Sequence, residues 1–439
     1  MTALELGFVA VVAIFAGVAL VRPWIGLCAY AWVGLMVPHR MIGGAVYDLP
    51  AAKVLALGVL IGLLTTRQWH PPPRAREWWW LAAFWLVCVA STFADPVSPD
   101  AAWFHLERFT KVVGMLVPTV LLLADASRLR AWLSVIALSL GAVGLITGAR
   151  AVATGFSVRL FGPEQSVIGD NNALAFALVV AVPLLVALER RAPTTWQRWG
   201  ARLLVAATIA GVVGTYSRGS LVVLALTLPA TLLCFYRTRV AFAWVPGAAL
   251  AVALVAPPAW LARMATIQPT AYRDDASGAE RMKSWYVAWR LGLDHPLLGA
   301  GFRPFAEHVY ERYIPGYRDY HNAHNHFLQV LAEHGFTGLA LFVAILTSTA
   351  WRLITTVRRA RDDPDLVWAA TWARGVGLAL LAYVLGGAFI NLAYFELLYW
   401  LIAAAILIER VTADLPATGA RDNQVRFMRA VVDEMRMRL

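Results

Sequence analysis

The chain has 439 residues, of which 60% are hydrophobic and only 15% are charged, and its net charge is +11. An ordinary soluble domain has about 45–50% apolar and about 25% charged residues, so this composition excludes one. Three cysteines cannot cross-link a chain of this length into a disulfide scaffold, and glycine and proline are too few for a fibrous protein. The composition therefore predicts an integral membrane protein that is all α-helical.

The apolar runs predict about 12 membrane-spanning helices, at roughly 20 residues for each span. The count becomes about 13 if proline at Arg22-Pro23 separates two short helices rather than bending one. The predicted spans are 3–21, 24–38, 51–66, 78–94, 109–124, 131–149, 170–188, 203–217, 219–235, 240–261, 336–351, 375–390 and 394–408.

The charges are distributed unevenly between the polar segments. Six short stretches contain 21 Lys or Arg against 10 Asp or Glu, whereas the long segment 263–335 contains eight of each. Loops rich in Lys and Arg stay in the cytoplasm, so the long segment is expected on the outer side. The basic charge is then a signal of topology, and a nucleic-acid partner is not expected. The basic stretches are 67–77, 125–130, 189–202, 236–239, 352–365 and 410–439.

This pattern divides the chain into four parts: N-terminal transmembrane helices at 1–262, an outer cap at 263–335, C-terminal transmembrane helices at 336–409 and a cytoplasmic tail at 410–439. The cap holds six of the nine histidines, which is unusual for a simple linker. Within it, residues 277–280 have the spacing of a capping box, with Ser277 as N-cap and Glu280 three residues later. We therefore expect a helix at 278–293 that carries Arg281 near its start.

Two arginines are candidates for binding an anion. Arg218 stands between two apolar runs with almost no loop between them, and an arginine at membrane depth costs at least about 2.5 kcal/mol. Arg218 should therefore face a cavity or an anionic partner, unless it reaches to the lipid headgroups. Arg281 either faces the same anion or is a solvated charge on the cap.

The histidine-rich segment His321 to His326 has three interpretations. His321 and His324 could bind a metal, but a cysteine or carboxylate partner at ligand spacing is missing. The segment could instead serve packing and capping alone. Third, His324 could be a general base, because imidazole titrates near neutral pH. If Asn325 caps the next helix, the positive helix end would keep His324 neutral.

A further polar cluster stands at the start of the span at 170–188. Asp170, Asn171 and Asn172 are typical N-cap residues. They could equally donate and accept hydrogen bonds with a sugar or phosphate.

In this order and spacing, the residues resemble the O-antigen ligase and polymerase superfamily of bacterial membrane glycosyltransferases, over about residues 160–405. The N-terminal third, with Pro38-His39-Arg40 and residues 47–50, resembles the subgroup called O-glycosylation ligases. Three motifs carry the main resemblance: Ser217-Arg218-Gly219, the stretch from Arg281 through Trp285 and Ala288 to Gly301, and His324-Asn325-His326-Phe327-Leu328 followed by Glu333, Gly335 and Gly338.

The resemblance implies a GT-C-like helical fold in the bacterial inner membrane, with the active site facing the periplasm. It implies inverting transfer of a glycan from undecaprenyl diphosphate to a hydroxyl of lipid A-core, with no metal and no cofactor. By motif, Arg218 and Arg281 would bind the diphosphate and His324 would be the base. Further candidate substrate-binding residues are Asp170, Asn171, Asn172, Arg303, His321, Asn325 and His326.

Three alternatives remain open from the sequence. A polymerase of the same superfamily would extend the glycan on its lipid carrier, and a protein O-oligosaccharyltransferase would modify Ser or Thr of a protein. A lipid or polysaccharide transporter would also carry intramembrane charges, but near the midplane, whereas the candidates here gather at the outer side. The expected partners are the lipid-linked donor, a hydroxyl acceptor and membrane lipids.

Overall fold

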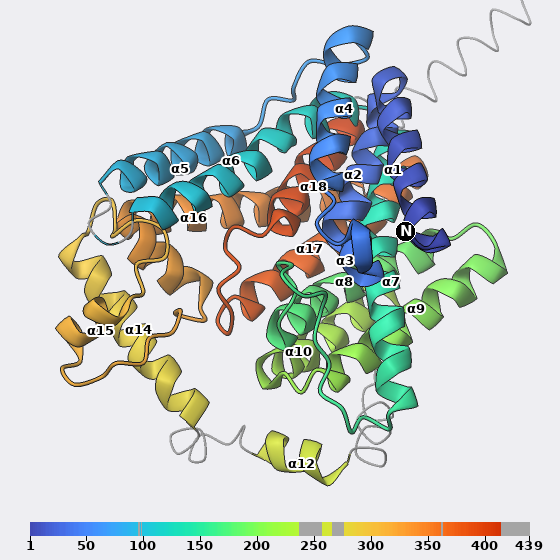
Figure 1. The fold of residues 1–439 in the computed structure, drawn as a ribbon. Helices are drawn as coiled ribbons and strands as arrows, with labels where there is room; N and C mark the ends of the chain where they lie inside the picture. The colour runs from blue at the N-terminus through green and yellow to red at the C-terminus, as the bar shows by residue number, and fades with distance from the viewer. Residues whose placement is uncertain (95–96, 98, 237–256, 266–275, 361–362, 414–439) are drawn as a thin grey trace, which may run out of the picture.

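The computed structural model describes residues 1–94, 97, 99–236, 257–265, 276–360 and 363–413, and these fold into helices without a strand (Figure 1). Most of the predicted span 240–261 and of the predicted tail lies outside the described residues. Six described helices are long and apolar enough to cross a membrane, so the chain is an α-helical, multi-pass membrane protein. These six spans are Ala3–Val21, Ala126–Ala153, Asn171–Arg191, Arg218–Phe235, His326–Arg359 and Pro364–Gly386.

The N-terminal helices pack closely through small residues. Arg22-Pro23 separates two helices, α1 (Ala3–Val21) and α2 (Pro23–Met36), which settles the alternative that the sequence left open. A Cβ atom on Gly26 of α2 would lie 2.3 Å from the Cβ atom of Ala19 in α1. Small residues at helix contacts let backbones approach in this way. The short α3 (Pro38–Ile42) and η1 (Gly44–Val46) then lead to α4 (Ala51–Thr66).

The centre of the bundle is built around α8 (Asn171–Arg191), which is buried on nearly all sides. It contacts α7 (Ala126–Ala153), α9 (Thr195–Gly214), α10 (Arg218–Phe235) and α17 (Val367–Gly386). A helix that is apolar around its whole circumference is expected in such a place. The second buried helix, α18 (Glu396–Ala413), contacts α6 (Pro99–Leu122), α7, α16 (His326–Arg359) and α17.

The described part of the cap, 276–335, contains α14 (Ala276–Asp294) and α15 (Glu307–Tyr313) on one flank of the bundle (Figure 1). Because α14 begins at Ala276, Ser277 lies inside the helix, and its expected place as N-cap is wrong. Both helices share a small hydrophobic core with the first segment of α16, which includes Val287, Leu291 and Tyr310. The cap therefore packs onto the helix that also carries the histidine segment.

Helix α16 is interrupted at Gly335, where the backbone is left-handed with φ 68°. The sequence predicts the start of a span directly after this residue, and that start stays a prediction, because the whole of His326–Arg359 has the length and hydropathy to cross a membrane. The break is filled by the preceding loop: the Phe336 N–H donates to the Pro296 carbonyl at 2.8 Å. A Cβ atom on Gly299 would lie 2.4 Å from the backbone of Glu333. The glycines of this loop are thus required by close approach of two backbones.

At the far end of α16 from the histidine segment, an ion-pair network joins three helices. The Arg352 guanidinium donates to both oxygens of Glu77 in α5 (Arg76–Phe93), at 2.9 and 2.7 Å. Arg352 also pairs with Glu409 of α18, which in turn accepts from Arg359 at 3.4 Å. The Glu77 side chain is only 2% exposed, so the network ties α5, α16 and α18 together in a largely buried place.

Candidate functional site

A pocket opens where the first turns of α8 and α10 meet the end of α17 and the start of α14. It is small, with about 10 Å³ of space, which is about enough for one water molecule. The amino ends of α8 and α10 both lie here, and such ends carry partial positive charge that favours anions. The lining residues are Asn172, Phe176, Val179, Ser217, Gly219, Ser220, Val223, Arg281, Gly386, Phe389 and Ile390.

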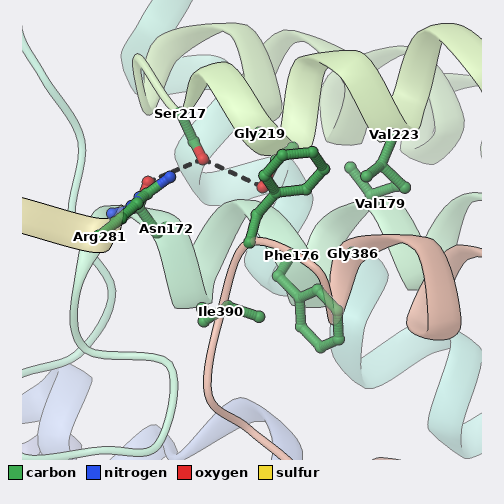
Figure 2. Close-up of a pocket in the computed structure, with 11 residues that line it drawn as sticks. Asn172, Phe176, Val179, Ser217, Gly219, Val223, Arg281, Gly386 and Ile390 are labelled. Carbon is green, nitrogen blue, oxygen red and sulfur yellow. Dashed lines mark hydrogen bonds between the residues drawn. The ribbon is translucent and has the colours of Figure 1, made fainter. Parts of the chain in front are cut away.

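The polar side of the pocket is a short chain of hydrogen bonds. The Ser217 hydroxyl donates to the side-chain oxygen of Asn172 at 2.9 Å and lies 3.1 Å from the Ser220 hydroxyl. Figure 2 shows the Arg281 side chain beside Ser217 and Asn172, with Phe176 farther along the pocket. The pocket therefore presents one guanidinium, two hydroxyls and an amide on one side and apolar groups on the other.

Arg281 reaches the pocket from the cap. Its helix is tied to the histidine segment, because the indole N–H of Trp285 donates to the Ala323 carbonyl at 2.7 Å. The Tyr310 hydroxyl lies 2.7 Å from both the Ser284 hydroxyl and the His321 carbonyl, and so reinforces the same contact. Among the described residues, no carboxylate forms a salt bridge with Arg281. Arg281 lines the pocket together with the side chains of Ser217, Ser220 and Asn172.

Arg218 begins α10 between the lining residues Ser217 and Gly219, but does not itself line the pocket. Tyr216, two residues before Arg218, has a left-handed backbone with φ 60°, and residues with such a backbone often occur at functional sites. A Cβ atom on Gly219 would lie 2.8 Å from Phe389. The glycine after Arg218 is therefore explained by close packing of α10 against the segment that follows α17.

The charge of Arg281 acts on His324. Burial, and then the positive charge of Arg281, lower the pKa of His324 to about 4. Its backbone is left-handed, with φ 47°. Asn325 is the N-cap of α16, with its side-chain oxygen accepting from the Phe327 and Leu328 N–H groups at 2.9 and 3.1 Å, which confirms the predicted cap. The neutral state of His324 has a different main cause from the predicted one, because burial exceeds the other influences.

Two other histidines of this segment have structural surroundings. His326 is buried, its N–H donates to the Gly387 carbonyl at 2.7 Å, and its ring lies 5.6 Å from that of Phe176. His326 therefore lies behind the pocket wall. His321 lies on the cap surface, with Nε2 3.6 Å from a carboxylate oxygen of Glu280 and with 40% of its side chain exposed.

Of the remaining candidates from the sequence, the structure places some in the lining of the pocket and others outside it. Asp170 is the N-cap of α8 and accepts from the Asn172 and Ala173 N–H groups. Asn171 is buried and donates to the Thr215 carbonyl at 2.9 Å, so only Asn172 of the three lines the pocket. Arg303 also does not line the pocket, and its backbone N–H donates to Glu333 at 3.1 Å.

Sequence reasoning missed several pocket residues. The hydroxyls of Ser217 and Ser220 flank Arg218 in the sequence, and their spacing of three on a helix start is a signal that could have identified them. Phe389 and Ile390 follow the end of α17 and carry no polar group, so the sequence gives no sign of their role. Within the described residues, no group of three His, Cys, Asp or Glu side chains converges as a metal-binding set.

A second, apolar groove of about 610 Å³ runs between α16 and α17. It begins at Phe327, two residues after the N-cap Asn325, and extends to Arg358 and Arg374 near the ion-paired end. The other lining residues are Cys234, Val343, Leu346, Thr347, Ala350, Leu353, Ile354, Val357, Ala373, Gly377, Leu378, Leu380, Leu381 and Val384.

Comparison with known proteins gave two family matches. Residues 203–343 match a family described as O-antigen ligase. Residues 3–193 match a family of unknown function (DUF5935). No curated protein matches the chain. The first match covers Ser217 and Arg281, which line the pocket, and His324, which does not line it.

Proposed function

We propose that this chain, whose residues 203–343 match a family described as O-antigen ligase, transfers a glycan from undecaprenyl diphosphate to a hydroxyl of lipid A-core. The observations that carry the proposal are the pocket lined by Arg281 and two hydroxyls, and the neutral imidazole of His324, whose pKa is lowered by the charge of Arg281. A cation and a proton acceptor that interact in this way match the two needs of this reaction. One is a stabilised leaving group and the other is an activated acceptor.

The leaving group requires positive charge. In the reaction, an acceptor oxygen bonds to the anomeric carbon of the glycan while the bond from that carbon to the diphosphate oxygen breaks. Undecaprenyl diphosphate departs with the bonding electrons, so negative charge grows on its oxygens. Arg281 and the amino ends of α8 and α10 stabilise that charge, and Arg218 stands at the first turn of α10 to assist.

The acceptor hydroxyl must lose its proton, and His324 takes it. With a pKa of about 4, the imidazole is neutral at physiological pH and free to accept. Binding of the diphosphate brings negative charge beside Arg281 and offsets the influence of that arginine. The pKa of His324 then rises toward neutral pH, which makes the imidazole a better base in the substrate complex.

The lipid part of the donor fits the apolar groove between α16 and α17. The groove starts at Phe327, close in sequence to His324 and Asn325, and its walls are almost wholly hydrocarbon. A prenyl chain lying there would leave its diphosphate near the histidine segment. This placement supports a lipid-linked donor over a soluble nucleotide sugar.

We assign the pocket to the periplasmic side of the bacterial inner membrane. The basic stretches 189–202 and 352–365 lie at the ends of α8 and α16 opposite to the pocket. The cytoplasmic preference of Lys and Arg then directs the pocket outward. In this arrangement the predicted 12 spans and the outer cap remain part of the proposal.

The test is transfer by the purified full-length protein in proteoliposomes. Undecaprenyl-diphosphate-linked glycan is supplied with lipid A-core, with an acceptor protein or with no second acceptor, and products are separated by gel and mass spectrometry. Glycosylated lipid A-core is the expected product. Modified protein as the product would indicate a protein O-oligosaccharyltransferase, and a lengthened lipid-linked glycan would indicate a polymerase. Absence of a product from every arm would refute the transferase assignment.

A matched pair of arginine variants tests the pocket itself. Arg281→Gln removes the guanidinium from the pocket and is expected to lower transfer about 10²–10³-fold, as loss of one electrostatic group does in other enzymes. Arg312→Gln is the control, because Arg312 lies on α15 with 66% of its side chain exposed. Equal activity of the two variants would contradict the role of Arg281.

A further inference from the structure

One face of α14 is apolar and uncovered. Met282, Tyr286, Trp289 and Leu293, here called the α14 stripe, are 41%, 48%, 47% and 46% exposed. Their spacing of four, three and four residues places them along one line of the helix. Leu297, at 72% exposed, extends the same apolar character beyond the helix end. A contiguous apolar surface of this kind is covered by a partner or a membrane in a stable protein.

The opposite face of α14 is already occupied. Ser284, Val287, Ala288 and Leu291 are buried, and the last three belong to the cap core. The Trp285 indole and the Tyr310 hydroxyl fasten the helix to the histidine segment. The helix therefore cannot rotate to hide its stripe without breaking the cap.

The stripe continues into the surface of a spanning helix. The Trp289 and Phe336 rings lie 6.0 Å apart at 88°, and Phe336 is the first residue of α16 after the break at Gly335. Phe336, Val343 and Ile354 are exposed and share one face of α16, a helix with the length and hydropathy of a membrane span. One apolar surface therefore runs from the spanning segment onto the cap.

Positive side chains border the stripe. On the helix, Lys283 and Arg290 fall on one side of it, where they lie over the rings of Tyr317 and Tyr313 at 3.9 and 6.0 Å. Arg281 falls on the other side, at the pocket. Asp294 at the helix end is already engaged, since it accepts from Arg312 at 3.3 Å and from Tyr313 at 2.8 Å. Aromatic residues flanked by Lys and Arg are typical of a helix that lies at the interface between lipid and water.

We propose that α14 is an interfacial helix, whose stripe lies in the lipid of the leaflet on the pocket side. Lipid is favoured over a second protein chain because the stripe is continuous with the membrane-facing surface of α16 and is bordered by cations that suit anionic headgroups. The cap is then seated on the bilayer, and Arg281 is held at the depth of lipid phosphates. This inference concerns where the cap lies and does not depend on the transfer reaction.

The experiment measures depth with nitroxide labels on the full-length protein in nanodiscs of phosphatidylethanolamine and phosphatidylglycerol. Cys28, Cys88 and Cys234 are first replaced by alanine, and single cysteines are then introduced. Trp289→Cys reports on the stripe. Trp351→Cys, 65% exposed on α16, is the lipid reference, and Glu311→Cys on α15 is the aqueous reference.

Collisions with oxygen and with a water-soluble nickel chelate are compared at each site. The expected result is a ratio of oxygen to chelate collisions that is several-fold higher at residue 289 than at 311, close to the ratio at 351. A ratio equal to that at 311 would overturn the proposal. Protection from both agents with dipolar broadening would also overturn it, because a second chain would then cover the stripe. Tyr286→Cys on the same face replaces Trp289→Cys if that variant does not insert.

Discussion

Arginines at the two ends of the helix bundle have different surroundings. At one end, Arg202 lies 2.9 Å from Glu189 and Arg352 lies 2.7 Å from Glu77, so each cation has a carboxylate beside it. At the other end, Arg281 faces Ser217 and Asn172 across a pocket. Paired charges cancel and hold helices together, whereas a cation surrounded by neutral groups leaves positive potential for an anion to use.

This contrast separates the ion-paired arginines from Arg281, for which we propose a binding role, where residue type alone does not. The sequence contains 38 Lys and Arg, and most of the excess lies in short loops. What distinguishes Arg281 is its position, on a helix fastened to His324 and directed at the amino ends of two other helices. Four measurements test whether the contrast is real, from the largest expected effect to the smallest.

His324→Asn should lower transfer by about 10²–10⁴-fold, the usual contribution of a general base. Asparagine is chosen because it adopts the left-handed backbone that His324 requires more readily than most residues. The melting temperature should therefore stay close to that of the parent protein, in contrast to substitutions at the ion-paired end. Transfer at the parental rate would remove His324 from the mechanism, and a collapsed melting temperature would make its role structural.

Arg352→Met should lower the free energy of unfolding by about 3–5 kcal/mol, because it leaves Glu77 buried without its cation. The measurement is thermal unfolding of the protein in detergent. The double variant Arg352→Met with Glu77→Gln is the matched control and should recover part of the loss, since the buried charge is gone. If the single variant melts like the parent protein, the ion-paired end does not stabilise the fold.

The pH dependence of transfer at low donor concentration should follow the pKa of free His324. Protonation removes the base, so the rate should hold from pH 7 to about pH 5 and reach half near pH 4. In Arg281→Gln the residual activity should be lost at a higher pH, because Arg281 lowers the pKa of His324. A half-point near the ordinary histidine value of about 6.5 in the parent protein would contradict this account.

Asn325→Ala should cost about 1 kcal/mol of stability, the usual value for removal of an N-cap. The side chain of Asn325 satisfies two N–H groups of the first turn of α16, next to His324. Thermal unfolding and transfer are measured together, with Asn325→Asp as the control that keeps the cap. If the alanine and aspartate variants lose the same amount of stability, the loss does not come from removal of the N-cap.

The sequence was sufficient for the features that depend on local chemistry. Apolar runs indicate the membrane class, and Asn325 and Asp170 have the side chains of the helix caps that they form. Local rules misplaced Ser277, because a capping-box spacing does not prevent the helix from starting earlier. The predicted 12 spans stay a prediction, because six described helices have the length and hydropathy to cross a membrane.

The pocket depended on contacts between distant segments, and the sequence could predict only part of it. Arg281, Asn172 and the neighbourhood of Arg218 were identified, since each carries a polar group in an unusual place. Phe389 was not, because an apolar residue after an apolar helix has no distinguishing mark. His326 was kept as a candidate because of its type, whereas the structure packs it against Phe176 and Gly387 behind the pocket wall.

The bond from the Trp285 indole to the Ala323 carbonyl has a consequence for the timing of assembly. It joins the helix that carries Arg281, the proposed phosphate-binding cation, to the loop that carries His324, the proposed proton acceptor, so their separation is set during folding. No part of the binding free energy of the substrate is then needed to bring these two groups together. Such advance ordering is how a protein lowers the entropic part of a reaction barrier before any reactant is present.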